Sequence, residues 1–204
     1  MAARHAARVW AGVDVGGRRK GFHLAVVDDG ARLLDGPARL LTPREVVDRL
    51  RRWRPRLVAV DSPRVPAPAG ACSRACERAF ARARICSLRY TPDRQAIRAN
   101  PYYEWIARGL ALYTALARAG LAAIECFPTA SWTRWVGPRR AEPRAAWSAR
   151  GLGRLGLDGV PARLGQDGRD AIAAAMTARL HDRGRSEVFG DIVVPLRETR
   201  HDAH

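Results

Sequence analysis

The stretch RVWAGVDVGGRRKGFHLAVVDDG (residues 8–30) decides the fold. Its first part is apolar and β-branched and stops at Gly16-Gly17, which predicts a strand. Its second part follows a basic turn and stops at Asp29-Gly30, a dipeptide typical of hairpin turns. We therefore expect two strands joined by a tight connection.

Downstream of this hairpin, a third strand is followed by helices that alternate with short buried strands. ARLLDGPARLL (31–41) supplies the third strand, and Thr42 as N-cap with Pro43 in the first turn predicts a helix. Two apolar runs are stopped by proline, as is typical of strands covered on both faces: RLVAVDSP (56–63) and LAAIECFP (121–128). Further helices are expected at 72–84, 101–119, 129–137, 142–156 and 167–182, and a last strand-like piece at 191–196.

This order of elements predicts an α/β fold with a mixed five-stranded sheet and helices on both faces. Three antiparallel strands come first and two parallel strands follow. A chain of 204 residues is expected to form a single domain, residues 1–204. We expect a helical, glycine-rich insert or flap around 138–166 and a polar tail from about residue 197.

The charge of the chain favours a polyanionic partner. Its formal net charge is +16, and each phosphate that a basic side chain neutralises releases counterions. Lys20 is the only lysine, so 35 of the 36 basic residues are arginines. A GC-rich genome produces such an arginine excess in proteins of any function. We therefore predict a nucleic acid as the partner and leave the oligomeric state open.

The chain shows no signal for a membrane or for secretion. No run of about 18 apolar residues occurs, and the basic N-terminus leads straight into a strand pattern without a signal-peptide core. The four cysteines lack a CxxC zinc knuckle and are expected to be thiols of a cytoplasmic protein.

Five acidic residues are placed where an α/β sheet binds ligands. Asp14 and Asp61 end strands and Glu125 lies within one, and the carboxyl ends of neighbouring strands form such a binding crevice. Asp167 and Asp170 are three residues apart at the start of a helix, so they face the same side. The alanines after them would let that helix pack closely on the sheet. We expect one acidic cluster.

Such a cluster calls for a hard divalent cation, because several carboxylates in one cleft repel one another. Mg²⁺ or Mn²⁺ takes oxygen ligands, and a pair of such ions can cleave phosphodiesters. Three of the acids also have a plain structural explanation. Asp14, Asp61 or Asp167 alone would more often be a turn or helix cap, whereas an unpaired Glu125 inside an apolar strand would be costly.

The sequence resembles the domain-of-unknown-function 429 family of predicted nucleases with a ribonuclease-H-like fold. The matching pieces occur in order along the chain: GVDVGG and KGFHLAVV within 12–27, VAVDSP (58–63), RACERAF (74–80), IECFPTASW (124–132) and DGRDAIAAAMTARL (167–180).

The resemblance implies a catalytic, metal-binding centre at Asp14, Asp61, Glu125 and Asp170, with Asp167 as a further metal ligand. It also suggests substrate contacts from several polar residues: Lys20, His23, Arg74, Glu77 and Arg78. The alternatives are a solvent-facing or hydrogen-bonded His23 and a salt-bridging Glu77 on a helix face.

The predicted function is a divalent-metal-dependent nuclease that hydrolyses DNA or RNA. The alternative is an inactive nucleic-acid- or nucleotide-binding module of ribonuclease-H-like fold. An ATP-dependent phosphotransferase, with Gly16-Gly17 cradling phosphates, ranks third, since the fold also hosts such enzymes.

Overall fold

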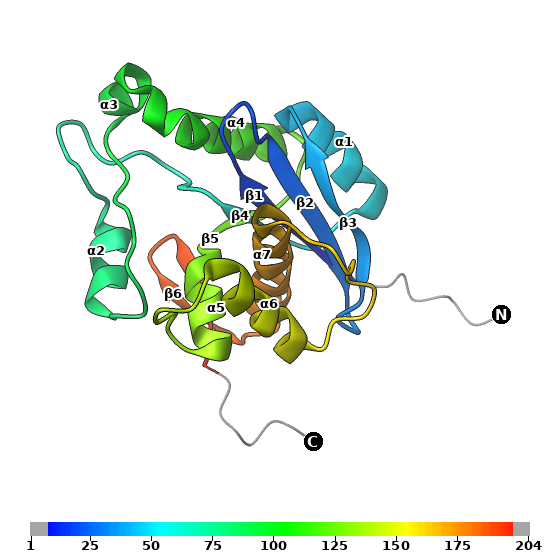
Figure 1. The fold of residues 1–204 in the computed structure, drawn as a ribbon. Helices are drawn as coiled ribbons and strands as arrows, with labels where there is room; N and C mark the ends of the chain where they lie inside the picture. Colours follow the sequence, from blue (N-terminus) through cyan, green and yellow to red (C-terminus); the bar gives the residue numbers. More distant parts are fainter. Residues whose placement is uncertain (1–7, 198–204) are drawn as a thin grey trace.

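A seven-stranded mixed sheet forms the centre of the protein, whose computed structural model describes residues 8–197 (Figure 1). The strand order is β3-β2-β1-β4-β5-β7-β6. β1, β2 and β3 are antiparallel neighbours, whereas β4, β5 and β7 run parallel to β1. The strands are β1 (Val9–Val15), β2 (Phe22–Asp28), β3 (Leu33–Leu40), β4 (Val58–Asp61), β5 (Ala123–Cys126), β6 (Ser186–Phe189) and β7 (Ile192–Pro195).

The mixed α/β architecture is confirmed, but the predicted number of five strands is wrong. The strand-like piece at 191–196 contains β7, which extends the sheet by pairing parallel with β5. β6 returns antiparallel to β7 through a turn at Gly190. β6 has no buried residue, so it lacks the apolar run by which the buried strands are recognised in the sequence.

Helices cover both faces of the sheet (Figure 1). On one face, α1 (Pro43–Trp53) and α4 (Glu104–Arg118) pack on the apolar side of β1, β2 and β4. On the other face lie α5 (Pro128–Val136), α6 (Arg144–Leu155) and α7 (Gln166–Asp182). Two shorter α-helices are α2 (Ala75–Arg82), beside β6 and β7, and α3 (Arg94–Ala99), which is followed by the 3-10 helix η1 (Pro101–Tyr103) before α4. None of the described helices is long and apolar enough to cross a membrane.

The predicted start of α1 is confirmed. Thr42 caps α1 by accepting a hydrogen bond from the Glu45 backbone N–H at 3.2 Å. The predicted insert around 138–166 contains α6, whose Trp147 is buried in the core. Whether this region moves as a flap stays a prediction, and the predicted tail lies, beyond residue 197, outside the described residues.

The contact between α7 and β1 is unusually close because both surfaces carry small residues. Ala171, Ala174 and Ala175 of α7 are fully buried against the sheet. A Cβ atom added to Gly12 of β1 would lie 2.0 Å from the Ala175 backbone nitrogen and 2.3 Å from the Ala171 carbonyl oxygen. Gly12 therefore allows the helix backbone to lie directly on the strand.

We predict that Gly12→Ala destabilises the protein by about 3 kcal/mol or more, because neither backbone can give way to the added methyl group. Gly153→Ala is the matched control: this helical glycine has open space around it, so alanine should raise stability by about 0.5–1 kcal/mol. Urea denaturation of both variants checks the difference. Equal stability of the two variants would contradict the close packing.

Candidate active site

Asp14, Asp61 and His23 are brought together by the register of three neighbouring strands. Asp14 of β1 is paired with His23 of β2 and with Asp61 of β4. Side chains that are paired across strands project to the same face. Trp10 is four residues before Asp14 on β1, so both side chains lie on the same face of the sheet. Because Trp10 is buried in the core cluster that contains α7, this is the face that α7 covers.

α7 adds two more carboxylates above these strands. Asp170 is buried, and its oxygens accept hydrogen bonds from Trp132 Nε1 at 2.8 Å, Gln166 Nε2 at 3.0 Å and an Arg144 Nη at 2.9 Å. Asp167 accepts from Lys20 Nζ at 3.0 Å. Asp167 is not the helix N-cap, since Gly165 occupies that position.

These residues line a cavity of about 470 Å³, which we call the acidic cavity. Gly16 and Gly17 lie at its edge, as the loop after β1, and Trp105 of α4 forms part of its wall. Its charged and polar lining consists of Asp14, Asp61, Asp167, Asp170, Lys20, Arg144 and Gln166. Four of the five predicted acids therefore meet in one cavity with two basic side chains.

Burial and mutual repulsion hold the proton on the strand-end acids. Burial, reinforced by the charges of Asp170 and Asp167, raises the pKa of Asp14 to about 8. Burial and the charge of Asp14 likewise raise the pKa of Asp61 well above its usual range. A cation that bound here would relieve this repulsion and displace the protons.

His23 faces the same acids. Its Nδ1 atom lies 3.8 Å from an Asp14 carboxylate oxygen and is buried without a hydrogen-bond partner. Burial lowers the pKa of His23, so the ring is held in its neutral form. One potential ligand atom each from Asp14, His23 and Asp167 lies within 4.8 Å of the others, a spacing from which one cation could be bound.

Glu125 lies apart from the acidic cavity. Its register partner on β4 is Val60, which packs on the α1 and α4 face, so Glu125 points away from the face of Asp14 and Asp61. Both Glu125 oxygens are bound by Arg74, at 2.7 and 2.6 Å, and one also accepts from the Arg64 backbone N–H at 2.7 Å. Its role as a metal ligand stays a prediction.

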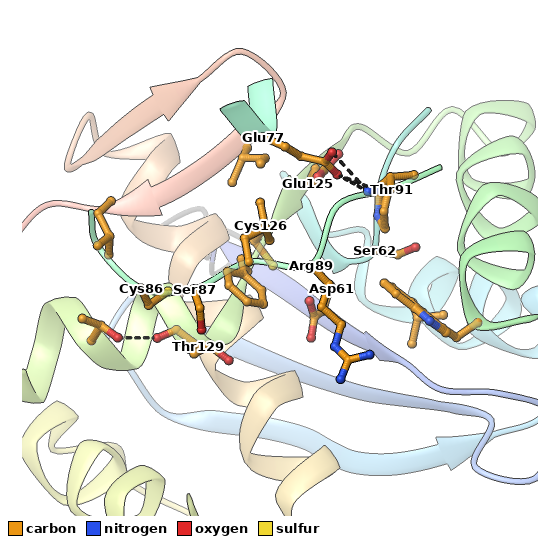
Figure 2. Close-up of a pocket in the computed structure, with 18 of the residues that line it drawn as sticks. Asp61, Ser62, Glu77, Cys86, Ser87, Arg89, Thr91, Glu125, Cys126 and Thr129 are labelled. Carbon is orange, nitrogen blue, oxygen red and sulfur yellow. Dashed lines mark hydrogen bonds between the residues drawn. The ribbon is translucent and has the colours of Figure 1, made fainter. Parts of the chain in front are cut away.

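Arg74 and Glu77 continue this buried network at the start of α2. Arg74 Nε donates to Glu77 at 3.0 Å, and the Thr91 hydroxyl donates to Glu77 at 2.5 Å. Glu77 is 1% exposed and Arg74 is 4% exposed. Figure 2 shows Glu125 beside Glu77 and Thr91, and Asp61 among the other residues that line the same pocket.

These residues line a second, larger cavity of about 640 Å³, which we call the deep cavity. Arg78 lines neither cavity and instead donates to the Ser73 carbonyl oxygen at 3.1 Å on the surface. Contact between substrate and Arg74, Glu77 or Arg78 stays a prediction.

Sequence reasoning did not identify Arg144, Trp132 and Gln166, which hold Asp170 in place. Arg144 carries no signal in a chain with 35 arginines among its 36 basic residues. Trp132 lies in the IECFPTASW piece and Gln166 precedes Asp167, so both are next to residues that the sequence did mark.

Asp14→Asn should stabilise the protein at alkaline pH. Because the folded protein holds the Asp14 proton up to about pH 8, the free energy of unfolding falls as the pH rises from about 4 toward 8. Asparagine removes this dependence, so the variant should melt at least about 3 °C above wild type at pH 8 and near it at pH 4. Thermal melting without metal checks this, with Asp48→Asn, at an exposed position, as the control. An Asp14→Asn variant that is no more stable than wild type at pH 8 would refute the raised pKa of Asp14.

Glu125→Gln, in contrast to Asp14→Asn, should destabilise the protein. It leaves the buried Arg74 guanidinium with only one of its two carboxylate partners, Glu77, which should cost about 3 kcal/mol of stability. Because Glu125 lies outside the acidic cavity, any rise in melting temperature that Mn²⁺ produces in wild type should persist. A folded Glu125→Gln variant that loses the Mn²⁺ response would make Glu125 a metal ligand after all.

Two solved structures of RuvC from Thermus thermophilus share the fold. One is described as "T. thermophilus RuvC in complex with Holliday junction substrate"; it is 21% identical with a TM-score of 0.53, and the match covers 87% of this chain and 96% of that chain. The other, "Thermus thermophilus RuvC structure", is 21% identical with a TM-score of 0.51, over 86% and 96% of the two chains. The protein therefore has the ribonuclease-H-like fold of RuvC.

Comparison with curated proteins gives no match. At the level of sequence families, the one described as "Protein of unknown function (DUF429)" matches residues 12–193, and the chain belongs to this family.

Proposed function

We propose that this protein is a divalent-metal-dependent nuclease that hydrolyses phosphodiester bonds of DNA or RNA. The observation that carries the proposal is the convergence of Asp14, Asp61, Asp167 and Asp170 on one cavity at the carboxyl ends of β1 and β4. Two further findings support it: the fold is that of RuvC, which has been solved with a Holliday junction substrate, and the net charge of +16 suits a polyanion.

The acids of the acidic cavity, together with His23 beside Asp14, fit Mg²⁺ or Mn²⁺. Carboxylate oxygens are the ligands that both ions prefer, and the buried His23 Nδ1 atom has no other partner. Asp14, His23 and Asp167 would hold one ion, while Asp61 and Asp170 would complete the site for the same ion or a second. Such ions supply an activated water and stabilise the leaving oxygen.

The other residues of the cavity would position the phosphate and the acids. Lys20 and Arg144 bring positive charge to the cavity and can donate to non-bridging phosphate oxygens. Gly16 and Gly17 have no side chains that would keep a phosphodiester backbone away from β1. Trp132 and Gln166 fix the Asp170 carboxylate, so its direction toward the cavity is set before substrate binds.

The second candidate is a nucleic-acid-binding module with an inactive site. It is favoured by the ion pairs of Lys20 with Asp167 and Arg144 with Asp170, which neutralise two of the four acids without a cation. The third, a phosphotransferase, is supported only by the position of Gly16 and Gly17 beside the acids. We place the activity in the cytoplasm, where the four free cysteines would stay reduced.

The nuclease proposal is tested by incubating the full-length protein with labelled single-stranded, double-stranded and branched DNA and with RNA. We expect cleavage of at least one substrate in Mg²⁺ or Mn²⁺, and none in excess chelator. Asp14→Asn and Asp170→Asn should each lower the rate by about 100-fold or more, whereas Asp48→Asn, on the exposed face of α1, should cleave like wild type. Binding without cleavage of any substrate would favour the inactive module, and cleavage by both site variants at the wild-type rate would refute the proposed centre.

A further inference from the structure

The deep cavity adjoins the acidic cavity and has a different chemical character. The two cavities share Val15, Asp61, Trp105 and Arg144 in their walls, so Asp61 lies at the boundary between them. The deep cavity also has apolar walls from Ile85, Leu88 and Phe127. A ligand that reaches the acids can therefore extend into this second space.

The wall of the deep cavity is fixed by the buried network of Arg74, Glu77 and Glu125. These charges are satisfied by one another, so they do not need a ligand. Thr91 donates to Glu77 through both its hydroxyl and its backbone N–H, which ties the segment before α3 to α2. Residues 85–89, which lie between α2 and this anchor, line the cavity.

We propose that the deep cavity binds an unpaired nucleotide of the substrate strand, next to the phosphate held at the acids. This inference rests on the proposed nuclease function for the position of the strand. A volume of about 640 Å³ lies in the range of pockets that enclose small organic ligands, roughly 300–1,000 Å³. It is therefore large enough for a base with its sugar.

The chemistry of the lining matches a nucleotide. A base is flat and apolar on its faces, and side chains such as Phe127, Leu88 and Trp105 offer surfaces for them. Its polar edge needs a few hydrogen-bonding groups, which Ser87, Thr129 and Thr133 carry. Its phosphate needs cations, and three arginines line the cavity besides the ion-paired Arg74: Arg89, Arg139 and Arg144.

This assignment sets the class of substrate. A base that is paired and stacked in an intact duplex cannot enter a cavity without being extruded, which costs a few kcal/mol. Strands with unpaired nucleotides avoid this cost. The protein should therefore select single-stranded, bulged or branched nucleic acid over a fully paired duplex.

The first test measures binding of small probes to the full-length protein by calorimetry. The four deoxynucleoside 5′-monophosphates are compared with 2-deoxyribose 5-phosphate, which lacks the base. At least one nucleotide should bind about tenfold more tightly than the sugar phosphate, as expected for one buried base. Equal affinities for all the probes, or no binding, would overturn the assignment.

Two cavity-filling variants from different chain segments locate the binding. Ser87 and Pro138 are exposed residues that line the cavity, so Ser87→Trp and Pro138→Trp fill it with little effect on the core. Each should weaken nucleotide binding about tenfold or more. Ala83→Trp is the control, since Ala83 is exposed but does not line the cavity. Thermal melting shows which variants are folded, and nucleotide binding unchanged in a folded filling variant would overturn the proposal.

The second test uses strands. Asp14→Asn, which should cleave at least about 100-fold more slowly than wild type, is titrated with a labelled duplex that carries one bulged nucleotide and with its fully paired counterpart. The bulged duplex should bind about tenfold more tightly, and Ser87→Trp in the same background should remove the difference. Equal binding of the two duplexes would overturn the proposal. Both tests measure binding alone. Nucleotide binding without cleavage would refute only the proposed nuclease function. An unchanged preference of Ser87→Trp for the bulged duplex would refute only the binding of the nucleotide in the deep cavity.

Discussion

The structure depends on the direct contact between the backbone of α7 and β1. Gly12 has no side chain, so Ala171 and Ala175 can lie where a Cβ atom would collide with the helix backbone. A larger residue on either side would move the helix outward. Asp14 is two residues after Gly12, and Asp170 directly precedes Ala171. The contact that closes the core therefore also places a helix carboxylate opposite a strand carboxylate.

This placement makes the site electrostatically costly, and the protein compensates for it in two ways. Asp14 and Asp61 keep their protons because burial raises their pKa values. Asp167 and Asp170 are instead paired with Lys20 and Arg144. A bound cation would replace both solutions and free the two basic side chains for a phosphate. Lys20 and Arg144 can therefore pair with the acids in the empty site and with a phosphate when substrate is bound.

The sequence predicts the first hairpin, α1 with its Thr42 cap and the buried strands, because each has a local pattern of apolar residues, a proline or a capping residue. It also predicts that four acids converge, because these acids lie at strand ends or at a helix start. It does not predict β6, which has no buried residue. It also groups Glu125 with the other acids, whereas Glu125 does not line the acidic cavity, because it is paired with Val60 rather than with Asp61. Arg144 and Trp132 reach Asp170 only through tertiary packing, for which a single sequence has no pattern.

The central claim is that a divalent cation binds between the strand-end acids and α7. Crystals of the full-length protein grown with Mn²⁺ would test it directly through the anomalous difference density of the metal. The account predicts a peak within coordination distance of Asp14, His23 and Asp167, with Lys20 moved away from Asp167. No peak in the acidic cavity, or a peak at Glu125 instead, would contradict it.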